Sequence, residues 1–491
     1  MSKSNKLNRR GFLGLLGAAG AGVAVERSGL LGRVIGRAYA GPPATATNYS
    51  VHIVGGNGSA SWFQLLWPHT AVATANNPAT GGVSSGRFAY HEAASAGLHF
   101  NQNDADGVNK RFFYSSQAPW ISGATPLPGM EVTGYMAGSN EHHRQQPTPL
   151  PLSSTTNLYQ ALASIRTSEA DTLIPVLGVG SFADRATREI PGLVTAASAD
   201  GVIELFNSAA SQRILAAEAD RDLFRDSYSA MVGLRAASSR SSWQPQLEVT
   251  KKAAGVVGLN FALQLAPTAG DLVGYGIDNL VGENLVAAQR AGIEEFGRSM
   301  IVASKALRAG LTRSVVVSMS NRPTSDRKWT DPHSSFSSAA DQSQTITAVR
   351  LLGEILTGFY NDLNATPEVT LGGAFSDHTV ISVQGDTMKN PLVAAGWPDA
   401  TPTDSNWIYV VGKGYLRHGW YGRIRRSSDP MASNAPQGFD PTTGDRNGSH
   451  SSSTTEAATA ALLYAITRGN LTQVNQFYSG PAITGLIAPS T

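Results

Sequence analysis

Two acid–imidazole pairs in the sequence have the donor atoms of a metal site. Asp331 and His333 flank Pro332, and because residues two apart in extended backbone point to the same side, both side chains could reach one ion. Asp377 and His378 are adjacent and would point in opposite directions, which suits two ions about 3.5–4 Å apart. Carboxylate oxygens and imidazole nitrogens bind Zn, Mn, Mg or Fe, so the pairs predict a divalent metal as cofactor.

Two further positions extend this candidate site. His143 follows His142 in a segment after a predicted strand, and it could bind the metal or hold an anionic oxygen. Asp404 comes shortly before another predicted strand and could be a weaker ligand. Each motif also has a structural interpretation, because Asp-Pro-His suits a loop, Ser-Asp-His-Thr suits a turn at a strand end, and the histidine pair suits a solvated loop.

Motifs of other common chemistries are absent from the sequence. It has no Walker loop and no H-E-x-x-H. The segment Gly178–Ala183 loosely fits G-x-G-x-x-A, but no partner acid completes it, so we interpret it as an ordinary strand-to-loop turn. No organic cofactor is therefore predicted.

The elements that must position these residues alternate along the chain. Several short β-rich runs are continuously apolar, which is typical of strands buried on both faces. The clearest helical pattern has apolar residues at spacings of three and four from Ile293 to Leu307 and ends at Gly310, and a second runs from Ile346 to Phe359. The predicted strands are Tyr49–Val54, Met130–Tyr135, Leu173–Gly178, Ser314–Met319, Val369–Phe375 and Trp407–Val411.

Strand and helix in alternation predict an α/β fold, with a mostly parallel sheet covered by helices on both faces. Ligands of such sheets collect beyond the carboxyl ends of the strands, where we expect both acid–imidazole pairs to lie. Long irregular segments interrupt the pattern. The longest, Arg425–Thr455, is rich in Ser, Gly, Pro, Asp and Asn, as functional or mobile loops often are.

The composition excludes several classes of protein. Of the 491 residues, 41% are hydrophobic, which is enough for a large core and argues against wholesale disorder. That length allows two or three domains, or one large α/β domain with long insertions. Because the chain has no cysteine, it can form no disulfide, thiolate metal site, iron–sulfur cluster or thiol nucleophile.

The first forty residues have the features of an export signal. Asn8–Leu13 contains a twin-arginine motif, an apolar stretch runs from Gly11 to Val25, and Ala38-Tyr39-Ala40 gives a cleavage site. The stretch is about fifteen residues, short of the roughly twenty that span a bilayer, and an uncleaved N-terminal anchor is the alternative. We predict a signal peptide over residues 1–40, twin-arginine translocation, and a periplasmic or secreted protein with no membrane span after signal removal.

The net charge argues against one kind of partner. The formal charge of +2 includes the signal, which carries seven basic residues and one acidic residue. The remaining chain has 31 basic and 35 acidic residues, a net charge of −4. A mildly acidic body without a basic run predicts no nucleic-acid partner.

Several motifs resemble those of one large bacterial family of exported proteins. The most specific stretch, Phe296–Phe336, resembles the family's long helix, strand and D-T-H motif. Val51–Asn57 is similar to its opening strand and G-G-N turn, and Glu141–Arg144 resembles its Ser-His element. Phe375–His378 occupies the place of its next acidic strand end, Asp404–Gly414 resembles the segment around its D-H motif, and Thr454–Gly469 is similar to its terminal helix.

The family is the Tat-exported family of unknown function numbered fifteen hundred and one, in the alkaline phosphatase and sulfatase superfamily. The resemblance implies a single alkaline phosphatase-like α/β domain over residues 41–491, with long loops. It also implies metal-dependent hydrolysis of a phosphate or sulfate ester, with a small anionic ester as substrate. In that interpretation His143 holds the anionic oxygen, and the metal ligands are Asp331, His333, Asp377 and His378, with Asp404 as a weaker one.

The chain departs from the family pattern at three positions. Gly58 stands where the family has an acidic residue, His142 replaces a serine and Ser405 replaces a histidine. A metal site loses affinity steeply when carboxylates are missing, because the ion's charge is left uncompensated. The sequence therefore leaves two main functions open, besides a partner subunit exported together with a redox enzyme, which no cofactor motif supports. One is a metal-dependent ester hydrolase, and the other is a catalytically degenerate binding or assembly protein that recognises an envelope glycan or protein.

Overall fold

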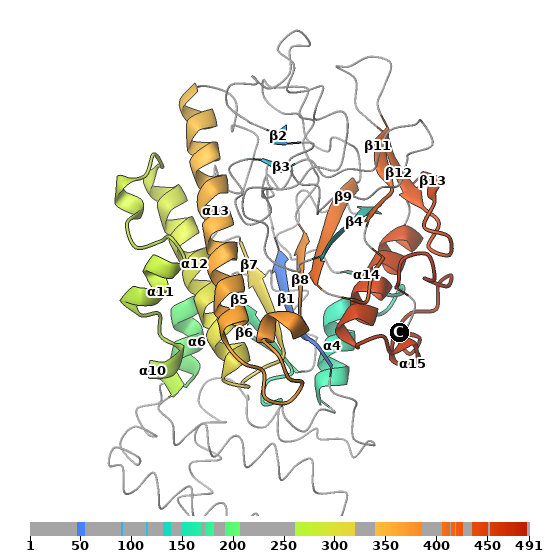
Figure 1. Ribbon diagram of the computed structural model, residues 1–491, viewed down its shortest axis with the longest axis horizontal. Coiled ribbons are helices and arrows are strands. Elements are labelled where there is room, and N and C mark those ends of the chain that lie inside the picture. The colour runs from blue at the N-terminus through green and yellow to red at the C-terminus, as the bar shows by residue number, and fades with distance from the viewer. Residues whose placement is uncertain are drawn as a thin grey trace, which may run out of the picture.

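An eight-stranded sheet with helices packed on both faces forms the centre of the protein (Figure 1). The structure of the protein is a computed structural model. The described residues are 47–54, 90–91, 114–115, 131–138, 150–167, 172–180, 192–206, 261–319, 339–384, 405–412, 414–417, 419–425, 435–449 and 452–488.

The strands of this sheet lie in the order β10-β4-β9-β8-β1-β7-β5-β6. Strand β9 is antiparallel to both of its neighbours, β4 and β8, and all other neighbouring strands are parallel. Seven strands therefore point in one direction and one points in the other. Their bounds are β1 Tyr49–Val54, β4 Glu131–Gly138, β5 Val176–Val179, β6 Leu193–Ala196, β7 Ser314–Ser318, β8 Thr379–Gln384, β9 Ser405–Gly412 and β10 Gly419–Tyr421.

Two small antiparallel sheets accompany the large one. Strands β2 (Tyr90–His91) and β3 (Tyr114–Ser115) pair with each other. Strands β11 (Arg423–Arg425), β12 (Ala435–Phe439) and β13 (Arg446–Ser449) form a three-stranded sheet. The aromatic rings of Tyr135 on β4, Tyr421 on β10 and Phe439 on β12 contact one another, which packs this smaller sheet against the large one.

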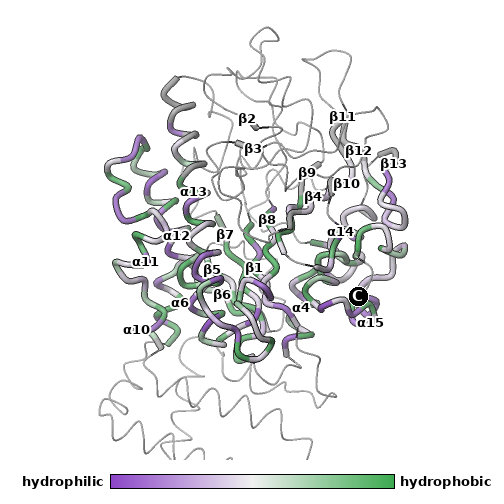
Figure 2. Tube along the Cα trace, in the orientation of Figure 1, coloured by the Kyte–Doolittle hydropathy of each residue, from purple (hydrophilic) through white to green (hydrophobic). Residues whose placement is uncertain are grey.

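Every residue of the three central strands β1, β7 and β8 is buried. Successive side chains point to opposite faces, so each strand contributes to two cores. On one face the core includes α6 (Ala199–Leu205), α12 (Ala287–Arg308) and α13 (Ala339–Ala365), and on the other it includes α4 (Leu158–Thr167) and α14 (Ser452–Ile466). Figure 2 shows the apolar central strands between these two groups of helices.

Helix α12 confirms the clearest helical prediction. Its buried side includes Ile293, Phe296 and Met300, at spacings that keep them on one face. Gly310 follows with a φ of 68°, its N–H donates to the carbonyl of Leu307, and the N–H of Leu311 donates to that of Ala306. This is the Schellman pattern, which ends a helix with glycine in the left-handed region. The second predicted helix is confirmed as the middle of α13.

Shorter elements complete the α12–α13 side and the C-terminal end. Helix α12 is preceded by α10 (Phe261–Leu265), α11 (Ala269–Gly274) and the 3-10 turn η5 (Leu280–Gly282). Helix α15 (Leu471–Val474) follows α14. Among the described helices, none combines the length and the apolar character needed to cross a membrane.

Five of the six predicted strands are confirmed, as β1, β4, β5, β7 and β9, with ends that differ by a few residues. The strand predicted at Val369–Phe375 is wrong. Those residues form turns in which Gly372 and Gly373 have φ values of 79° and 76°, followed by the 3-10 turn η7 (Phe375–His378). A left-handed backbone cannot continue a strand, so the strand begins only at Thr379.

The close approach of α13 to the end of α11 depends on Gly358. A Cβ atom at this position would lie 2.5 Å from the carbonyl oxygen of Gly274 and 3.0 Å from the Cα of Tyr275. We expect Gly358→Ala to lower the free energy of unfolding by about 1–3 kcal/mol, because the two backbones must move apart. Gly274→Ala is the matched control, since a Cβ there meets no heavy atom within 4 Å. Equal midpoints of chemical denaturation for the two variants would contradict this prediction.

Candidate functional site

The carboxyl ends of the parallel strands lie along one edge of the large sheet. Val54, the last residue of β1, is level with Ser318 at the end of β7 and with Gln384 at the end of β8. Gly138, which ends β4, pairs with Ser405, the first residue of the antiparallel β9. Strands β4, β8, β1 and β7 therefore end, and β9 begins, at the same edge, which we call the carboxyl edge.

Four of the candidate site residues follow or precede these strand ends. His143 comes five positions after Gly138, Asp404 directly precedes Ser405, and Asp331 and His333 come after β7. All four lie outside the described residues. The described strand ends show only that the chain enters or leaves each of these segments at the carboxyl edge.

Asp377 and His378 lie at the opposite edge, so their predicted place at a carboxyl strand end is wrong. They belong to η7 and directly precede β8, whose first residue, Thr379, is level with Tyr49 at the start of β1. From Thr379 to Gln384 the strand is about 16 Å long, at about 3.3 Å per residue. A metal–ligand bond is only about 2–2.6 Å long, so an ion at the carboxyl edge is out of their reach.

The two side chains hold the turn before β8. Asp377 Oδ2 accepts a hydrogen bond of 2.9 Å from the N–H of Ala374. His378 Nε2 lies 2.6 Å from the carbonyl oxygen of Gly372. A carbonyl oxygen only accepts, so Nε2 must carry a proton and donate it. In this arrangement Nε2 has no lone pair to offer to a metal.

A buried carboxylate anchors the same turn to β1, and sequence patterns gave no signal for it. Glu368 is 3% exposed, and its Oε1 accepts a hydrogen bond of 3.0 Å from the hydroxyl of Tyr49. Its other carboxylate oxygen accepts from the N–H of Leu371. The guanidinium of Arg313 lies 4.7 Å from the centre of the Tyr49 ring, a cation–π contact. Glu368 and Tyr49 are 319 positions apart, so their pairing could be found only from the fold.

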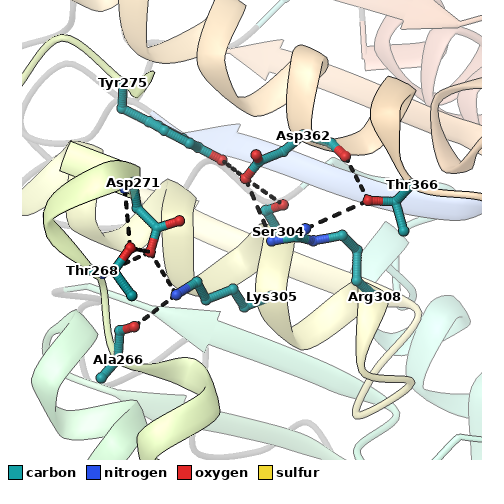
Figure 3. Close-up of polar contacts among 9 residues, drawn as sticks. All are labelled: Ala266, Thr268, Asp271, Tyr275, Ser304, Lys305, Arg308, Asp362 and Thr366. Carbon is teal, nitrogen blue, oxygen red and sulfur yellow. Dashed lines mark hydrogen bonds and ion pairs between the residues drawn. The ribbon is translucent and has the colours of Figure 1, made fainter. Parts of the chain in front are cut away.

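A second group of charged side chains joins α11, α12 and α13 (Figure 3). Lys305 Nζ lies 2.6 Å from Asp271 Oδ2 and donates to the carbonyl of Ala266 at 2.7 Å. Asp362 Oδ2 accepts from the hydroxyls of Tyr275 at 2.9 Å and Ser304 at 3.2 Å. Its ion pair with Arg308 measures 3.5 Å. Each charge is used between helices, so we interpret the group as structural.

The pKa shifts in this group follow from those contacts. Burial tends to raise the pKa of Asp271, but hydrogen bonds from Lys305 and Thr268 outweigh burial and hold the pKa below its usual value. Asp271 therefore stabilises the fold above the pKa it has when unfolded, and that contribution is lost as the pH falls through the lowered value. Burial, and then the Asp362 carboxylate, raise the pKa of Tyr275 well above its usual value, so this phenol stays protonated as a donor.

Within the described stretches, no three His, Asp or Glu side chains come together as a metal site would require. Comparisons with models of protein families and with curated proteins found no match. The family resemblance therefore rests on the sequence motifs quoted above. From the structure, the candidate site is reduced to the residues that neighbour the carboxyl edge in sequence.

The structural role of Asp377 can be tested by stability. We expect Asp377→Ala to lower the free energy of unfolding by about 0.5–2 kcal/mol, because the N–H of Ala374 loses its acceptor as at a helix N-cap. Asp278→Ala is the control, because Asp278 is exposed and should change stability by less than about 0.5 kcal/mol. Urea titration followed by circular dichroism measures both variants. A wild-type midpoint for Asp377→Ala would show that the turn does not need this carboxylate.

Proposed function

We propose that the protein is an exported, alkaline phosphatase-like hydrolase that cleaves phosphate or sulfate esters with a divalent metal. In this proposal Asp331 and His333 are the principal ligands, Asp404 is a weaker ligand and His143 holds an anionic oxygen of the ester. Asp377 and His378 are left out, because they hold a turn at the other edge of the sheet.

The direction of the strands supports this proposal more than any other observation. In open α/β sheets, ligands bind beyond the carboxyl ends of the parallel strands. Strands β4 and β7 both end at the carboxyl edge, and β9 begins there. The segments with His143, Asp331, His333 and Asp404 are the direct continuations of these three strands. For each of the four residues, the nearest strand in sequence therefore begins or ends at the carboxyl edge.

The donor set suits the chemistry proposed. Two carboxylates and one imidazole are ligands for Zn, Mn, Mg or Fe, and a divalent ion held by them would polarise the ester and activate water. A positively charged or neutral His143 could donate a hydrogen bond to a non-bridging oxygen of a phosphate or sulfate group. No organic cofactor enters the proposal.

One observation favours the second candidate, a binding or assembly protein of the cell envelope. Of five candidate ligands, two are used in a structural turn, and the three departures at Gly58, His142 and Ser405 remove further donors expected from the family. A carboxyl edge that has lost its ligands could still bind an anionic glycan or an envelope protein, because a fold does not determine function.

Metal analysis separates the two candidates. We expect the purified mature protein to retain a stoichiometric divalent ion, and Asp331→Ala and His333→Ala each to weaken its binding at least 10–100-fold, roughly the loss caused by removing an outer-shell partner. Asp377→Ala is the matched control and should retain the ion, because its carboxylate lies at the other edge of the sheet. Elemental analysis after dialysis measures the content, and hydrolysis of p-nitrophenyl phosphate and sulfate measures activity.

Two results would contradict the hydrolase proposal. A folded wild-type protein without metal and without activity, even after Zn, Mn, Mg or Fe is added, would leave the binding function. Loss of the ion in Asp377→Ala, but not in Asp331→Ala, would instead put the site at the wrong edge of the sheet.

Export by the twin-arginine route is a separate prediction. We expect replacement of Arg9 and Arg10 by lysine to retain the precursor inside the cell, because the route recognises the arginine pair. Replacing Lys3 and Lys6 by glutamine is the control and should leave export intact. Fractionation of cells with immunoblotting measures export, and N-terminal sequencing should find Gly41 as the first residue of the mature protein. Unchanged export of the arginine variant would exclude this route.

A further inference from the structure

Five buried polar side chains form a continuous row across the centre of the sheet on its α4 side. The row, which we call the His52 chain, consists of Ser382 on β8, His52 and Ser50 on β1, Ser314 on β7 and Arg166 on α4, and all five residues have 0% exposure. The proposed function does not use them. Their surroundings are otherwise the apolar core between the sheet, α4 and α14.

Four contacts link the row from end to end. His52 Nδ1 lies 2.7 Å from Ser382 Oγ, and His52 Nε2 lies 3.1 Å from Ser50 Oγ. Ser50 Oγ lies 2.9 Å from Ser314 Oγ, and Arg166 Nε donates to Ser314 Oγ at 3.0 Å. The central strand β1 is thus joined by side chains to both of its neighbours.

Arg166 favours one direction for these hydrogen bonds. A guanidinium has donors only, so Ser314 Oγ accepts from Arg166 and the hydroxyl proton of Ser314 is free to point to Ser50. Ser50 can then donate its own proton to His52 Nε2, and His52 Nδ1–H donates to Ser382. In this arrangement each hydroxyl turns its oxygen toward the cation. The reverse arrangement would turn hydroxyl protons toward Arg166 and leave the proton of Ser314 without an acceptor in the row.

We propose that the His52 chain holds His52 as the neutral tautomer with its proton on Nδ1, and that protonation of this imidazole in acid breaks the chain and destabilises the sheet. The His52 chain is therefore an acid-sensitive hydrogen-bond network at the centre of the sheet.

Protonation breaks the chain because an imidazolium donates at both nitrogens. Ser50 would then have to accept from Nε2 and turn its proton toward Ser314, which already accepts from Arg166, so the Ser314 proton would lose its acceptor in the row. A second positive charge would also enter a fully buried site that already holds the guanidinium. Burial, and then Arg166, lower the pKa of His52 to about 3, in agreement with this geometry.

Few other groups in the described part of the chain can change the protonation state of His52. Helix α4 faces His52 with Arg166 and with the ring of Tyr159, whose centre lies 5.9 Å away. Burial keeps the pKa of Tyr159 far above its usual value, so this phenol stays neutral. Strand β8 faces His52 with the hydroxyl of Ser382, and β7 acts through Ser314 and Ser50. Arg166 is thus the charged group that acts on the protonation of His52.

The sign of the pH effect follows from the lowered pKa. An unfolded histidine binds a proton below about pH 6.5, whereas folded His52 does so only below about pH 3. Between these values the unfolded state binds one more proton at this residue, so stability falls as the pH falls. The contribution amounts to about a tenfold change in the unfolding equilibrium constant per pH unit, and it is absent above about pH 6.5.

The tautomer can be measured in the wild-type protein. With ¹⁵N-labelled histidine, long-range nitrogen–proton NMR spectra should contain one imidazole that is protonated on Nδ1 and remains neutral at pH 5. That signal should be lost in His52→Gln and kept in the matched control His378→Gln. An Nε2–H pattern for His52, or its titration near pH 6.5, would overturn the proposal.

The loss of stability in acid can be measured by unfolding experiments. Between pH 6.5 and 3, His52→Gln should show a slope of the logarithm of the unfolding constant that is smaller than that of the wild type by one proton per molecule. An unchanged slope would overturn the proposal. If His52→Gln does not fold, Ser50→Ala keeps the imidazole but separates it from Ser314, so the Nδ1–H signal should give way to a mixture of tautomers. A pure Nδ1–H signal in Ser50→Ala would show that the chain does not control the tautomer.

Discussion

Burial of β1 between two parallel neighbours is the constraint on which the arrangement of the sheet depends. Its Val51 and Ile53 face the α12–α13 core, and Ser50 and His52 face α4. A slip of β1 by one residue would exchange the two sets and bury hydroxyls and an imidazole among apolar side chains. The register that avoids this cost also makes β1, β7 and β8 end at the same level, and that common level is what defines the carboxyl edge.

The two edges of the sheet differ in how their polar groups are used. At the opposite edge, where the parallel strands begin, Asp377 and His378 form hydrogen bonds with the backbone of one turn, and Glu368 accepts a hydrogen bond from Tyr49. Tight turns of this kind fix the positions of strands. The carboxyl edge instead leads into segments that lie outside the described residues, and binding residues of open α/β sheets collect beyond the carboxyl ends of the strands. This division favours the carboxyl edge as the place for chemistry.

The elements that sequence patterns could predict are those in which local preference and burial agree. Helix α12 has an apolar face, and Gly310 marks its end, so both were visible in the sequence. The segment Val369–Phe375 has strand-like residues, but two glycines in left-handed conformation and a carboxylate anchored on a distant strand decide its structure. Strand β8 was missed because its Ser382 breaks the apolar run, and the partner that accounts for that serine, His52, is 330 positions away. Long-range polar pairs of this kind have no local signature.

The fate of Asp377 and His378 gives a physical criterion for the remaining candidates. An acid–imidazole pair is available to an ion only if its oxygens and one ring nitrogen are not already committed to the backbone. Asp377 has one oxygen on the N–H of Ala374, and His378 donates its Nε2 proton to the carbonyl of Gly372, so only Nδ1 of this imidazole keeps a lone pair. In Asp331-Pro332-His333 the proline has no N–H to occupy a neighbouring carboxylate and restricts the residue before it to extended conformations. That restriction favours the extended backbone in which both side chains point to the same side, and this preference of the sequence is the reason to keep Asp331 and His333 as the proposed ligands.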